Sequence, residues 1–418
     1  MKNENIIYFA FMDYDVNKQR EQQEVERFSK KNRILFIEKP FSLFFFFLNK
    51  NKRNKKNLKK ITSWKQGAKR CSNSHNLYFY TPRPSWYPLT RVPLINKLYY
   101  KLFINDLKKI QYDLKFEKPL LWITQPPTFP VINHFHEKCV IADWCNTWEE
   151  WFAPILLKGW WWKGLRKINL QWKRYWITKI LKKADIVLVS AIKYYNYAKK
   201  YNNNVHFFPN GADIKTFISH NDHKTIPDDL KSIKTPRLGI MSANINKLVV
   251  DINLIKLLSQ SHPKWSIVFV GKINGNIENI DKLKNVYFFG SKSHPELPKY
   301  LQNCDVNLIP YNLKEGKTLT QSGIPTKLPE YLSVGKPVVS VYLEEIEKIK
   351  DFKNVVYLAK NQNDFLKKVE QAMIENNEKL EEKRKFIAQK YDWDKIVNQM
   401  ENKIEIFLTK KYGTQGNQ

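Results

Sequence analysis

The chain has 418 residues, which is long enough for two or three domains with ample hydrophobic core. Hydrophobic residues make up 43% of it and aromatic residues 14%, a composition that excludes an intrinsically disordered chain. There are 71 Lys and Arg residues against 40 Asp and Glu, so the formal net charge is +31. Such a charge implies an acidic partner, for which nucleic acid, an anionic membrane and a diphosphate-bearing substrate are the candidates.

The cysteines and the N-terminus indicate the compartment. Cys71, Cys139, Cys145 and Cys304 form no C-x-x-C pair, which predicts free thiols in a reducing compartment and argues against a zinc site. The apolar run in residues 1–11 is too short for a signal peptide and lacks a small-residue cleavage site. No stretch reaches the roughly 18 apolar residues of a membrane span. We therefore expect a cytoplasmic protein.

The first predicted elements are two strands, Ile6–Phe11 and Arg33–Glu38, with a polar helix at Asn17–Phe28 between them. The order strand, helix, strand is typical of a parallel sheet. Arg20 lies on the polar helix, and a solvated helix face is the simplest interpretation of its position.

An aromatic stretch follows the second strand. Residues 41–48 include the adjacent Phe44, Phe45 and Phe46, and a run rich in Lys, Arg and Asn occupies 49–60. An apolar patch beside a dense cationic run is typical of a segment that lies in a membrane interface. The alternative is a buried strand or helix followed by a charged loop.

A second stretch of the same kind lies at residues 159–167. It holds three adjacent indoles, Trp160, Trp161 and Trp162, together with Lys and Arg. Three adjacent indoles cannot all face one core, and tryptophan favours the membrane interface. The two stretches together predict a protein that is peripheral on the inner face of the plasma membrane, where the anionic surface is its partner.

Leu120–Thr124 and Cys139–Trp144 are the next predicted strands. Asp143 and Asn146 lie at the carboxyl end of the second strand, where parallel sheets bind their ligands. Asp143 is therefore a candidate for acid/base chemistry. The alternative is that Asp143 or Asn146 caps a helix.

The division into domains follows from the later motifs. The sequence Pro-Asn-Gly-Ala-Asp, which contains Asn210, is by itself only a turn signal after a strand. The strand Arg237–Met241 begins the second domain, and the loop after it carries Ser242 and Lys247. The predicted division is an N-terminal domain at 1–213, a linker at 214–236, a C-terminal domain at 237–390, a terminal helix at 391–409 and a disordered tail at 410–418.

The most informative stretch is 323–342, which predicts a turn, a short helix, a stop and a buried strand. Thr326 is a predicted helix cap. Lys327 lies in the first turn of the helix beside free backbone N–H groups, which is an arrangement that binds anions. Glu330 follows three residues later, near the same face. A diphosphate and a ribose diol would fit these groups, although a capped helix with two solvated charges is an equally good interpretation.

The segment from Pro325 to Val339, with its Lys327, its Glu330-Tyr331-Leu332 and its Gly-Lys-Pro-Val-Val, resembles the donor-binding segment of GT-B glycosyltransferases. The likeness is greatest to the family 4-like bacterial enzymes that build cell-surface glycans, including those of the teichuronic-acid type. The Pro-Asn-Gly-x-Asp motif at 209–213 and the order of the motifs agree with it. In this family a second glutamate often stands eight residues before the first, where this chain has Ser322.

The resemblance implies an α/β fold of two Rossmann-like domains that face each other across a cleft, with a C-terminal helix that crosses back. It implies sugar transfer from a nucleotide-sugar, which is a substrate and not a cofactor, to a lipid-linked or surface-glycan acceptor. Anomeric configuration would be retained and no metal needed. Glu330 would bind the ribose, and Lys327, Lys247, Thr326 and Ser242 would hold the diphosphate end of the donor.

The resemblance also assigns cleft or acceptor-side positions. It places Arg20 at the mouth of the cleft, Asn210 at the domain crossover, and Asp143 and Asn146 in a segment related to the family's Tyr-Asp-x-x-Asp. Two other classes of function stay open. One is a non-catalytic glycan- or membrane-binding scaffold on the same fold, which Ser322 and Asn146 favour as departures from the pattern. The other is a nucleic-acid-binding protein, for which the chain has the charge but no motif.

Overall fold

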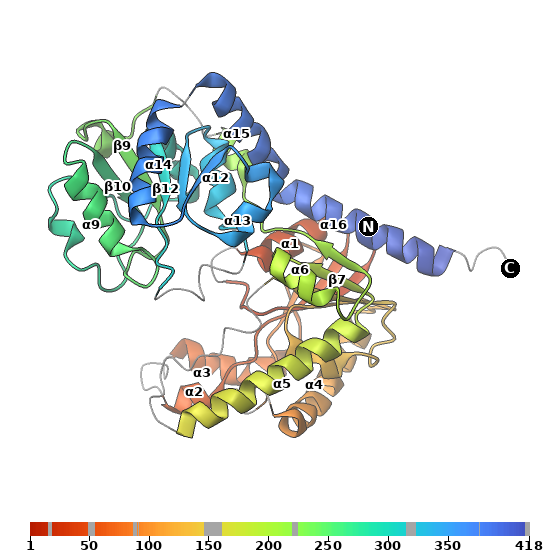
Figure 1. Ribbon diagram of the computed structural model, residues 1–418. Helices are drawn as coiled ribbons and strands as arrows, with labels where there is room; N and C mark the ends of the chain where they lie inside the picture. The colour runs from red at the N-terminus through yellow and green to blue at the C-terminus, as the bar shows by residue number, and fades with distance from the viewer. Residues whose placement is uncertain are drawn as a thin grey trace. The chain divides into compact units, whose positions relative to one another are not determined.

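The computed structural model describes residues 1–15, 19–48, 55–86, 90, 92–145, 161–219, 225–314, 323–375 and 377–413. The chain folds into two compact units, which are coloured along the chain in Figure 1. Unit 1 is Met1–Phe208 together with Val397–Gln418, and unit 2 is Pro209–Ile396. Helix α16 (Trp393–Tyr412) begins in unit 2 and ends in unit 1, which confirms the predicted C-terminal helix that returns to the first domain.

Unit 1 is built on an eight-stranded sheet in the order β3-β4-β2-β1-β5-β6-β7-β8. All its pairings are parallel except the short edge pair β3·β4. Its strands are β1 (Asn5–Phe9), β2 (Arg33–Ile37), β3 (Lys69–Arg70), β4 (Leu77–Tyr80), β5 (Leu120–Ile123), β6 (Cys139–Trp144), β7 (Ile186–Val189) and β8 (Val205–Phe207). Its helices are α1 (Arg20–Phe28), α2 (Leu43–Leu48), α3 (Lys55–Thr62), α4 (Pro93–Asp113), α5 (Trp161–Lys183) and α6 (Ile192–Ala198).

The strands of unit 1 carry apolar side chains on both faces of the sheet, because successive side chains of a strand point to opposite sides. Ile7 and Leu121 belong to a core that is closed by buried residues of α4, α5 and α6. Tyr8 and Trp122 point the other way, and Phe28 of α1 packs on Trp122 with ring centroids 5.0 Å apart. Both faces are therefore covered, as a parallel sheet requires.

Unit 2 contains a six-stranded sheet in the order β11-β10-β9-β12-β13-β14, with every pairing parallel. Its strands are β9 (Arg237–Met241), β10 (Ser266–Val270), β11 (Val286–Phe288), β12 (Val306–Ile309), β13 (Val338–Val341) and β14 (Val356–Ala359). Its helices are α7 (Ile214–Ser219), α8 (Asp228–Lys231), α9 (Ile252–Ser261), α10 (Leu297–Gln302), α12 (Lys327–Ser333), α13 (Glu344–Lys348), α14 (Gln362–Ile374) and α15 (Glu378–Lys390).

The helices of unit 2 divide between the two faces of its sheet. Residues of α9 and α14 share one buried core with β9, β10 and β12, and residues of α7, α12 and α15 share another (Figure 1). The stretch 214–236, expected to be a linker, belongs to unit 2. It contains α7 and α8, whose apolar residues Ile214, Phe217 and Leu230 are buried in unit 2.

Both sheets have the same winding. The chain starts at a central strand, β1 or β9, adds strands outward on one side, and then returns to the other side of that strand with β5 or β12. In such sheets ligands bind at the carboxyl ends of the strands, at the point where the strand order reverses. We call the ends of β1 and β5, with the loops that follow them, the unit 1 switch point. The ends of β9 and β12 with their loops are the unit 2 switch point.

Candidate functional site

Lys327 and Tyr331 attach helix α12 to the unit 2 switch point. The Lys327 Nζ donates a hydrogen bond of 2.7 Å to the carbonyl oxygen of Met241, the last residue of β9. The Met241 N–H donates in turn to the hydroxyl of Tyr331, also at 2.7 Å. Tyr331 is fully buried, so the first turn of α12 is held against the end of β9. The segment that the sequence singles out is therefore brought to the place where a parallel sheet binds ligands.

The ammonium of Lys327 lies in surroundings that favour a bound anion. Burial lowers the pKa of Lys327 to about 8, although the charge of Glu330 acts in the opposite direction. The Nζ also lies 5.0 Å from the centroid of the Tyr311 ring, just beyond the end of β12. A cation held in low dielectric interacts more strongly with an added negative charge than a solvated lysine does.

Glu330 contacts a residue that the sequence did not reveal. Its Oε1 lies 3.2 Å from Nε2 of His294, in the short 3₁₀ helix His294–Glu296. The Glu330 side chain is 12% exposed and that of His294 is 44% exposed. Hydrogen bonding to the Glu330 carboxylate raises the pKa of His294, and the charges of Glu330 and Asp213 add to the effect. Sequence reasoning missed His294 because the two residues are 36 positions apart and only the fold pairs them.

Ser242 lies where the backbone is most crowded. Its side chain is buried and donates a hydrogen bond of 2.9 Å to the carbonyl oxygen of Asn244. A Cβ on Gly271 would lie 1.7 Å from the Ser242 carbonyl oxygen, and Gly271 has a φ of +145°. The glycine that permits close backbone approach beside this loop is thus at the end of β10.

Two predicted donor-binding residues have other surroundings. Thr326 is exposed, and its side chain makes no capping hydrogen bond because its backbone is already helical, with φ −55° and ψ −30°. The prediction of a Thr326 cap is therefore wrong. Lys247 forms an ion pair with Glu278, with 3.5 Å between Nζ and Oε1. Its place in the loop after β9 is as expected, but its charge is shared with a carboxylate.

Asp143 is at the end of β6 in unit 1 and is completely buried. Its two oxygens accept hydrogen bonds from the Arg20 guanidinium at 3.2 and 3.3 Å, and Oδ2 also accepts one from the Trp122 indole N–H at 3.3 Å. Arg20 additionally donates to the carbonyl oxygen of Phe208 at 2.8 Å. The predicted catalytic carboxylate and the predicted cleft arginine thus form one buried ion pair. The solvated interpretation of Arg20 and the helix-cap alternative for Asp143 do not describe these contacts.

Two further buried carboxylates lie beside this pair on α1. Glu24 is 2.8 Å from Arg20 Nε and accepts a hydrogen bond of 2.7 Å from the Tyr8 hydroxyl. Burial and the charge of Asp143 raise the pKa of Glu24 well above its usual value. Together with Glu21, also on α1, these residues form a group of four buried charged side chains on α1 and β6, of which three are acidic.

Glu21 lies at the unit 1 switch point itself. Its Oε1 accepts hydrogen bonds of 2.7 Å from the N–H of Phe11, after β1, and from the hydroxyl of Thr124, after β5. Its Oε2 accepts from the N–H of Met12 at 3.1 Å. Burial raises the pKa of Glu21 to about 7, although these donors favour the charged form. Nothing in the sequence singles out this residue beyond its place in a polar helix.

The structure shows less about the remaining predicted site residues. Asn210 has a buried Oδ1 without a hydrogen-bond partner among the described residues. Asn146, Trp160 and the departure at Ser322 lie outside the described residues. Trp161 and Trp162 begin α5, and Phe44 and Phe45 belong to α2, but their side chains are also outside the description; Phe46 is buried.

The unit 2 arrangement combines an anion-binding lysine with a carboxylate that can accept hydrogen bonds from a diol. Both groups come from one helix at the switch point, and the carboxylate is held by a partly exposed histidine that a ligand can replace. These are the functional groups needed to hold the diphosphate and ribose of a nucleotide. In unit 1, in contrast, Arg20 and Asp143 neutralise each other, and Glu21 is satisfied by protein donors.

Comparison with known proteins agrees with this chemistry. Residues 222–393 match the family described as Glycosyl transferases group 1. The chain is 27% identical over 300 residues to a protein of Bacillus subtilis (strain 168) whose name describes a teichuronic acid biosynthesis glycosyltransferase, TuaH. That match covers 68% of this chain and 71% of the relative.

Solved structures with the same architecture have low sequence identity. Sucrose-phosphate synthase from Thermosynechococcus elongatus has a TM-score of 0.65 at 12% identity, covering 97% of this chain and 100% of the other. Anabaena HepE in complex with UDP and glucose has a TM-score of 0.59 at 13% identity, covering 96% and 100%. The Escherichia coli trehalose-6-phosphate protein bound with UDP-2-fluoro glucose has a TM-score of 0.62 at 9% identity, covering 97% and 99%. At these identities they establish the fold, which is GT-B.

Proposed function

We propose that this chain, a GT-B glycosyltransferase with a group 1 transferase domain, moves a sugar from a nucleotide-diphosphate sugar to a lipid-linked or surface-glycan acceptor. We further propose that it works at the inner face of the plasma membrane, retains anomeric configuration and needs no metal. The observation that carries the donor part of the proposal is the pair Lys327 and Glu330 on the helix that is attached to the end of β9.

In this proposal Lys327 binds the diphosphate and stabilises the charge that develops on it as the glycosidic bond breaks. Its position against the Met241 carbonyl gives it a fixed geometry, which is the property that makes a cation effective in a transition state. Lys247 adds a second cation when it leaves Glu278.

Glu330 binds the ribose hydroxyls. The imidazole of His294 occupies its Oε1 at 3.2 Å, and a ribose diol replaces or shares that hydrogen bond. The nucleotides named in the solved structures of HepE and of the Escherichia coli protein are UDP and a UDP-sugar, which supports a uridine nucleotide as the first donor to test.

Asp143 acts in this proposal as a positioning residue. Its carboxylate is satisfied by Arg20 and Trp122, so it is poorly placed to exchange protons with a substrate. Arg20 bridges it to the backbone of Phe208, and the pair therefore fixes α1 against the ends of β6 and β8. That fixes the loops of unit 1 that follow these strands, which are the natural place for an acceptor.

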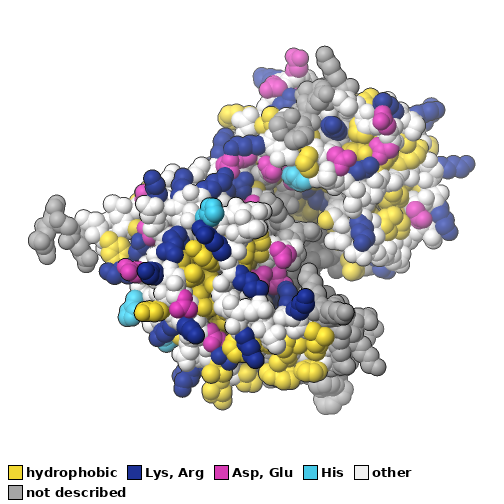
Figure 2. Space-filling model, turned by 180° about the vertical axis from the view of Figure 1, so that it is seen from behind, with side chains coloured by type: hydrophobic (Ala, Val, Ile, Leu, Met, Phe, Trp, Pro, Cys, Tyr) yellow, Lys and Arg dark blue, Asp and Glu magenta, His cyan; other side chains and the backbone are white. Residues whose placement is uncertain are grey.

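The surface of α4 supports the membrane part of the proposal. Leu94, Leu98 and Leu102 are spaced four residues apart and are 70%, 59% and 55% exposed. The exposed Lys97 and Lys101 adjoin them along the helix. An apolar stripe flanked by lysines suits the interface of an anionic bilayer. Hydrophobic and basic side chains also adjoin one another at the lower end of the surface drawn in Figure 2.

Part of the predicted aromatic stretch is exposed as well. Phe47 of α2 is 54% exposed and stacks on Trp86, which is 49% exposed, with 6.0 Å between the ring centroids. Among the described residues, none of the helices is both long and apolar enough to cross a bilayer. The contact with the membrane that we propose is accordingly peripheral and uses side chains on α2 and α4.

The donor part of the proposal is tested by turnover. Purified protein is incubated with UDP-sugars, and release of UDP is followed with and without membrane lipid extract as a source of acceptor. We expect release that depends on the extract and falls on the order of a hundredfold in Glu330→Ala. Glu347→Ala, which removes an exposed carboxylate from α13 of the same unit, is the matched control. Nucleotide binding without turnover under every condition would favour the scaffold alternative.

The membrane part is tested by co-sedimentation with vesicles that contain phosphatidylglycerol. Leu98→Asp together with Leu102→Asp should weaken binding roughly tenfold or more, because two apolar contacts are lost and two like charges are added. Ile374→Asp is the matched control, since Ile374 is 83% exposed but lies in unit 2. Equal binding by both proteins would contradict a membrane contact through α4.

A further inference from the structure

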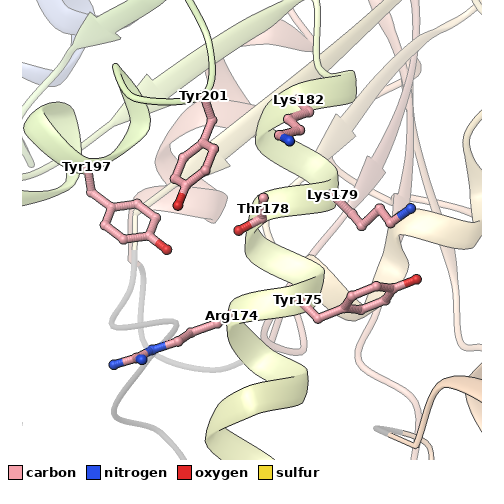
Figure 3. Close-up of a pocket in the computed structure, with 7 residues that line it drawn as sticks. All are labelled: Arg174, Tyr175, Thr178, Lys179, Lys182, Tyr197 and Tyr201. Atoms are coloured by element: carbon pink, nitrogen blue, oxygen red, sulfur yellow. The ribbon is translucent and has the colours of Figure 1, made fainter.

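A groove on unit 1 has no role in the donor chemistry. It lies between α5 and the segment formed by α6 and the turn after it, and its volume is about 610 Å³. Figure 3 shows the side chains that line it. Arg174, Thr178 and Lys182 come from α5 at intervals of four residues, so they lie on one side of that helix. Tyr197 and Tyr201 come from the opposite wall.

The groove has a polar and aromatic lining on both walls. In Figure 3 the Tyr197 ring and the Thr178 hydroxyl point into the space between the two walls, and the Tyr201 ring runs along its own wall. Arg174 extends from α5 to the side on which the tyrosines lie. The two rings are 5.3 Å apart at their centroids. Tyr197 also meets the buried ring of Trp144 edge to face at 5.6 Å, which fixes its orientation.

Asn202 holds the two walls together. Its Nδ2 donates hydrogen bonds to the carbonyl oxygens of Leu181 at 2.8 Å and Ala184 at 2.7 Å, at the end of α5. Its Oδ1 accepts from the N–H of Asn204 at 2.7 Å, in the chain that leads into β8. The residue next to Tyr201 is thus tied to α5, so the width of the groove is set by hydrogen bonds and a ligand would meet a preformed site.

The charged side chains that line the groove are basic, so they favour an anionic ligand. Arg174, Lys179 and Lys182 line it, and its described lining contains no carboxylate. Lysines in the last turns of a helix are ordinarily explained by the helix dipole, which accounts for Lys182. Arg174 lies nine residues before the end of α5 and is outside the reach of that effect. Its charge adds to those of the lysines, and the sum is best compensated by a ligand.

We propose that this groove binds a phosphate-bearing carbohydrate, at a site separate from that of the nucleotide-sugar donor. The phosphoryl group lies between Arg174 and Lys182, because a guanidinium and an ammonium together supply the donors for its oxygens. The sugar ring lies on Tyr197 and Tyr201, whose ring faces pack on its C–H groups while their hydroxyls and that of Thr178 meet its hydroxyls. If the proposed function is correct, the acceptor is the natural source of this ligand, and that identity alone rests on the proposed function.

The test is a residue-resolved footprint on the full-length protein. Lysines are acetylated with and without glucose 1-phosphate, and the rate at each lysine is measured by mass spectrometry. We expect glucose 1-phosphate to slow acetylation of Lys182 at least fivefold while Lys108 of α4, an exposed lysine outside the groove, keeps its rate. Arg174→Gln should raise the concentration that gives half-protection roughly tenfold, and Lys109→Gln, also exposed on α4, should leave it unchanged.

A second comparison tests the sugar subsite. Tyr201→Leu should weaken protection by glucose 1-phosphate several-fold and leave protection by inorganic phosphate unchanged, since only the sugar contacts the ring. The proposal is overturned if glucose 1-phosphate does not protect Lys182. It is also overturned if phosphatidylglycerol vesicles protect Lys182 and glucose 1-phosphate does not, which would assign the groove to the lipid surface. Neither readout depends on turnover, so a failure here is distinct from a failure of the proposed transferase activity.

Discussion

The two switch points have the same topology, but they differ in how far their charged side chains are buried and in how these are paired. In unit 1, Glu21 at the switch point is buried, and so is the adjacent ion pair of Asp143 and Arg20. In unit 2, Glu330 is bonded to a histidine that is 44% exposed. The same winding of a parallel sheet thus produces a closed ionic cluster in one unit and a set of exchangeable polar contacts in the other.

The difference shows that position at a switch point does not by itself make a residue a ligand-binding group. A buried ion pair that is already satisfied offers a substrate nothing without a large cost, because separating its members leaves an uncompensated charge. A partly exposed pair such as Glu330 and His294 can be exchanged for a ligand at little cost, because water competes for it already. On this reasoning we propose that the buried pair of unit 1 positions the neighbouring loops and that Glu330 of unit 2 binds the donor.

Removing the Asp143 carboxylate should have the largest effect, and it should be on stability. Asp143→Ala leaves Arg20 buried without its main partner, which costs about 3–5 kcal/mol in the free energy of unfolding. The measurement is urea denaturation followed by circular dichroism. Asp113→Ala, an exposed carboxylate at the end of α4, is the control and should stay within about 0.5 kcal/mol of the wild type. A loss below about 1 kcal/mol for Asp143→Ala would contradict the description of Asp143 and Arg20 as a buried pair that depends on both members.

Lys327→Ala should affect activity more than stability. Losing a preorganised cation at the developing charge costs about 2.7–4 kcal/mol, so kcat/KM should fall on the order of a hundredfold or more. Lys353→Ala, which removes an exposed lysine of the same unit, should leave it unchanged. If the two variants had equal kcat/KM, Lys327 would have no role in binding the donor.

The same lysine predicts a pH dependence. Its pKa in the folded protein is about 8, so kcat/KM should fall as the pH rises through that value, and Lys327→Arg should remove the fall. The same titration affects stability in the opposite direction, so that stability rises with pH while kcat/KM falls. Between about pH 8 and 10.5 the unfolded chain binds a proton that the folded protein does not, so the free energy of unfolding increases with pH there.

Glu21 should make unit 1 less stable as the pH rises. Its pKa is about 7 in the folded protein against 4.5 for the unfolded chain, so the folded state binds the extra proton between these values. From pH 4.5 to 7 the loss should be on the order of 2–3 kcal/mol, and Glu21→Gln should abolish it. The measurement is a series of urea denaturation curves across this range. A wild-type curve with the same pH dependence as Glu21→Gln would show that the buried carboxyl does not titrate there.

His294 should give the smallest effect. Because Glu330 raises its pKa, the pair contributes stability that is complete below about pH 6.5 and is lost as the pH rises through the folded pKa. The pair is partly exposed, so the contribution should be below about 1 kcal/mol. His294→Ala should change the KM for the donor by a few-fold at most, measured in the UDP-release assay. A hundredfold effect would instead make His294 part of the donor site, and the contact with Glu330 could then not be described as exchangeable.

The fold could be predicted because its signals are local. Buried β-branched strands such as Val338–Val341, a turn glycine at Gly335 and the order of motifs are all visible in the sequence. Lys327 and Glu330 were identifiable for the same reason, since both lie on one short helix. The burial of Arg20 could not be predicted, because its partner Asp143 is 123 residues away and a polar helix has no visible sign that its charged face is turned inward.

Other features depend on packing that no short pattern records. The stretch 214–236 is polar overall, yet Ile214 and Phe217 are buried and pack α7 into the core of unit 2. Thr326 has a residue type that caps helices, but its helical backbone prevents it from doing so. The stripe of Leu94, Leu98 and Leu102 was visible in principle at a spacing of four, but only the structure shows that it faces away from the core.

The central claim, that the unit 2 switch point binds the donor nucleotide, is tested most directly by thermal unfolding with UDP, GDP, dTDP and CMP. At 100 times its dissociation constant a ligand stabilises the folded protein by about 2.7 kcal/mol, which is a measurable shift in Tm. We predict that one of these nucleotides raises the Tm of the wild type and of Glu347→Ala but not that of Glu330→Ala. A shift that persists in Glu330→Ala, or the absence of a shift with every nucleotide, would contradict the claim.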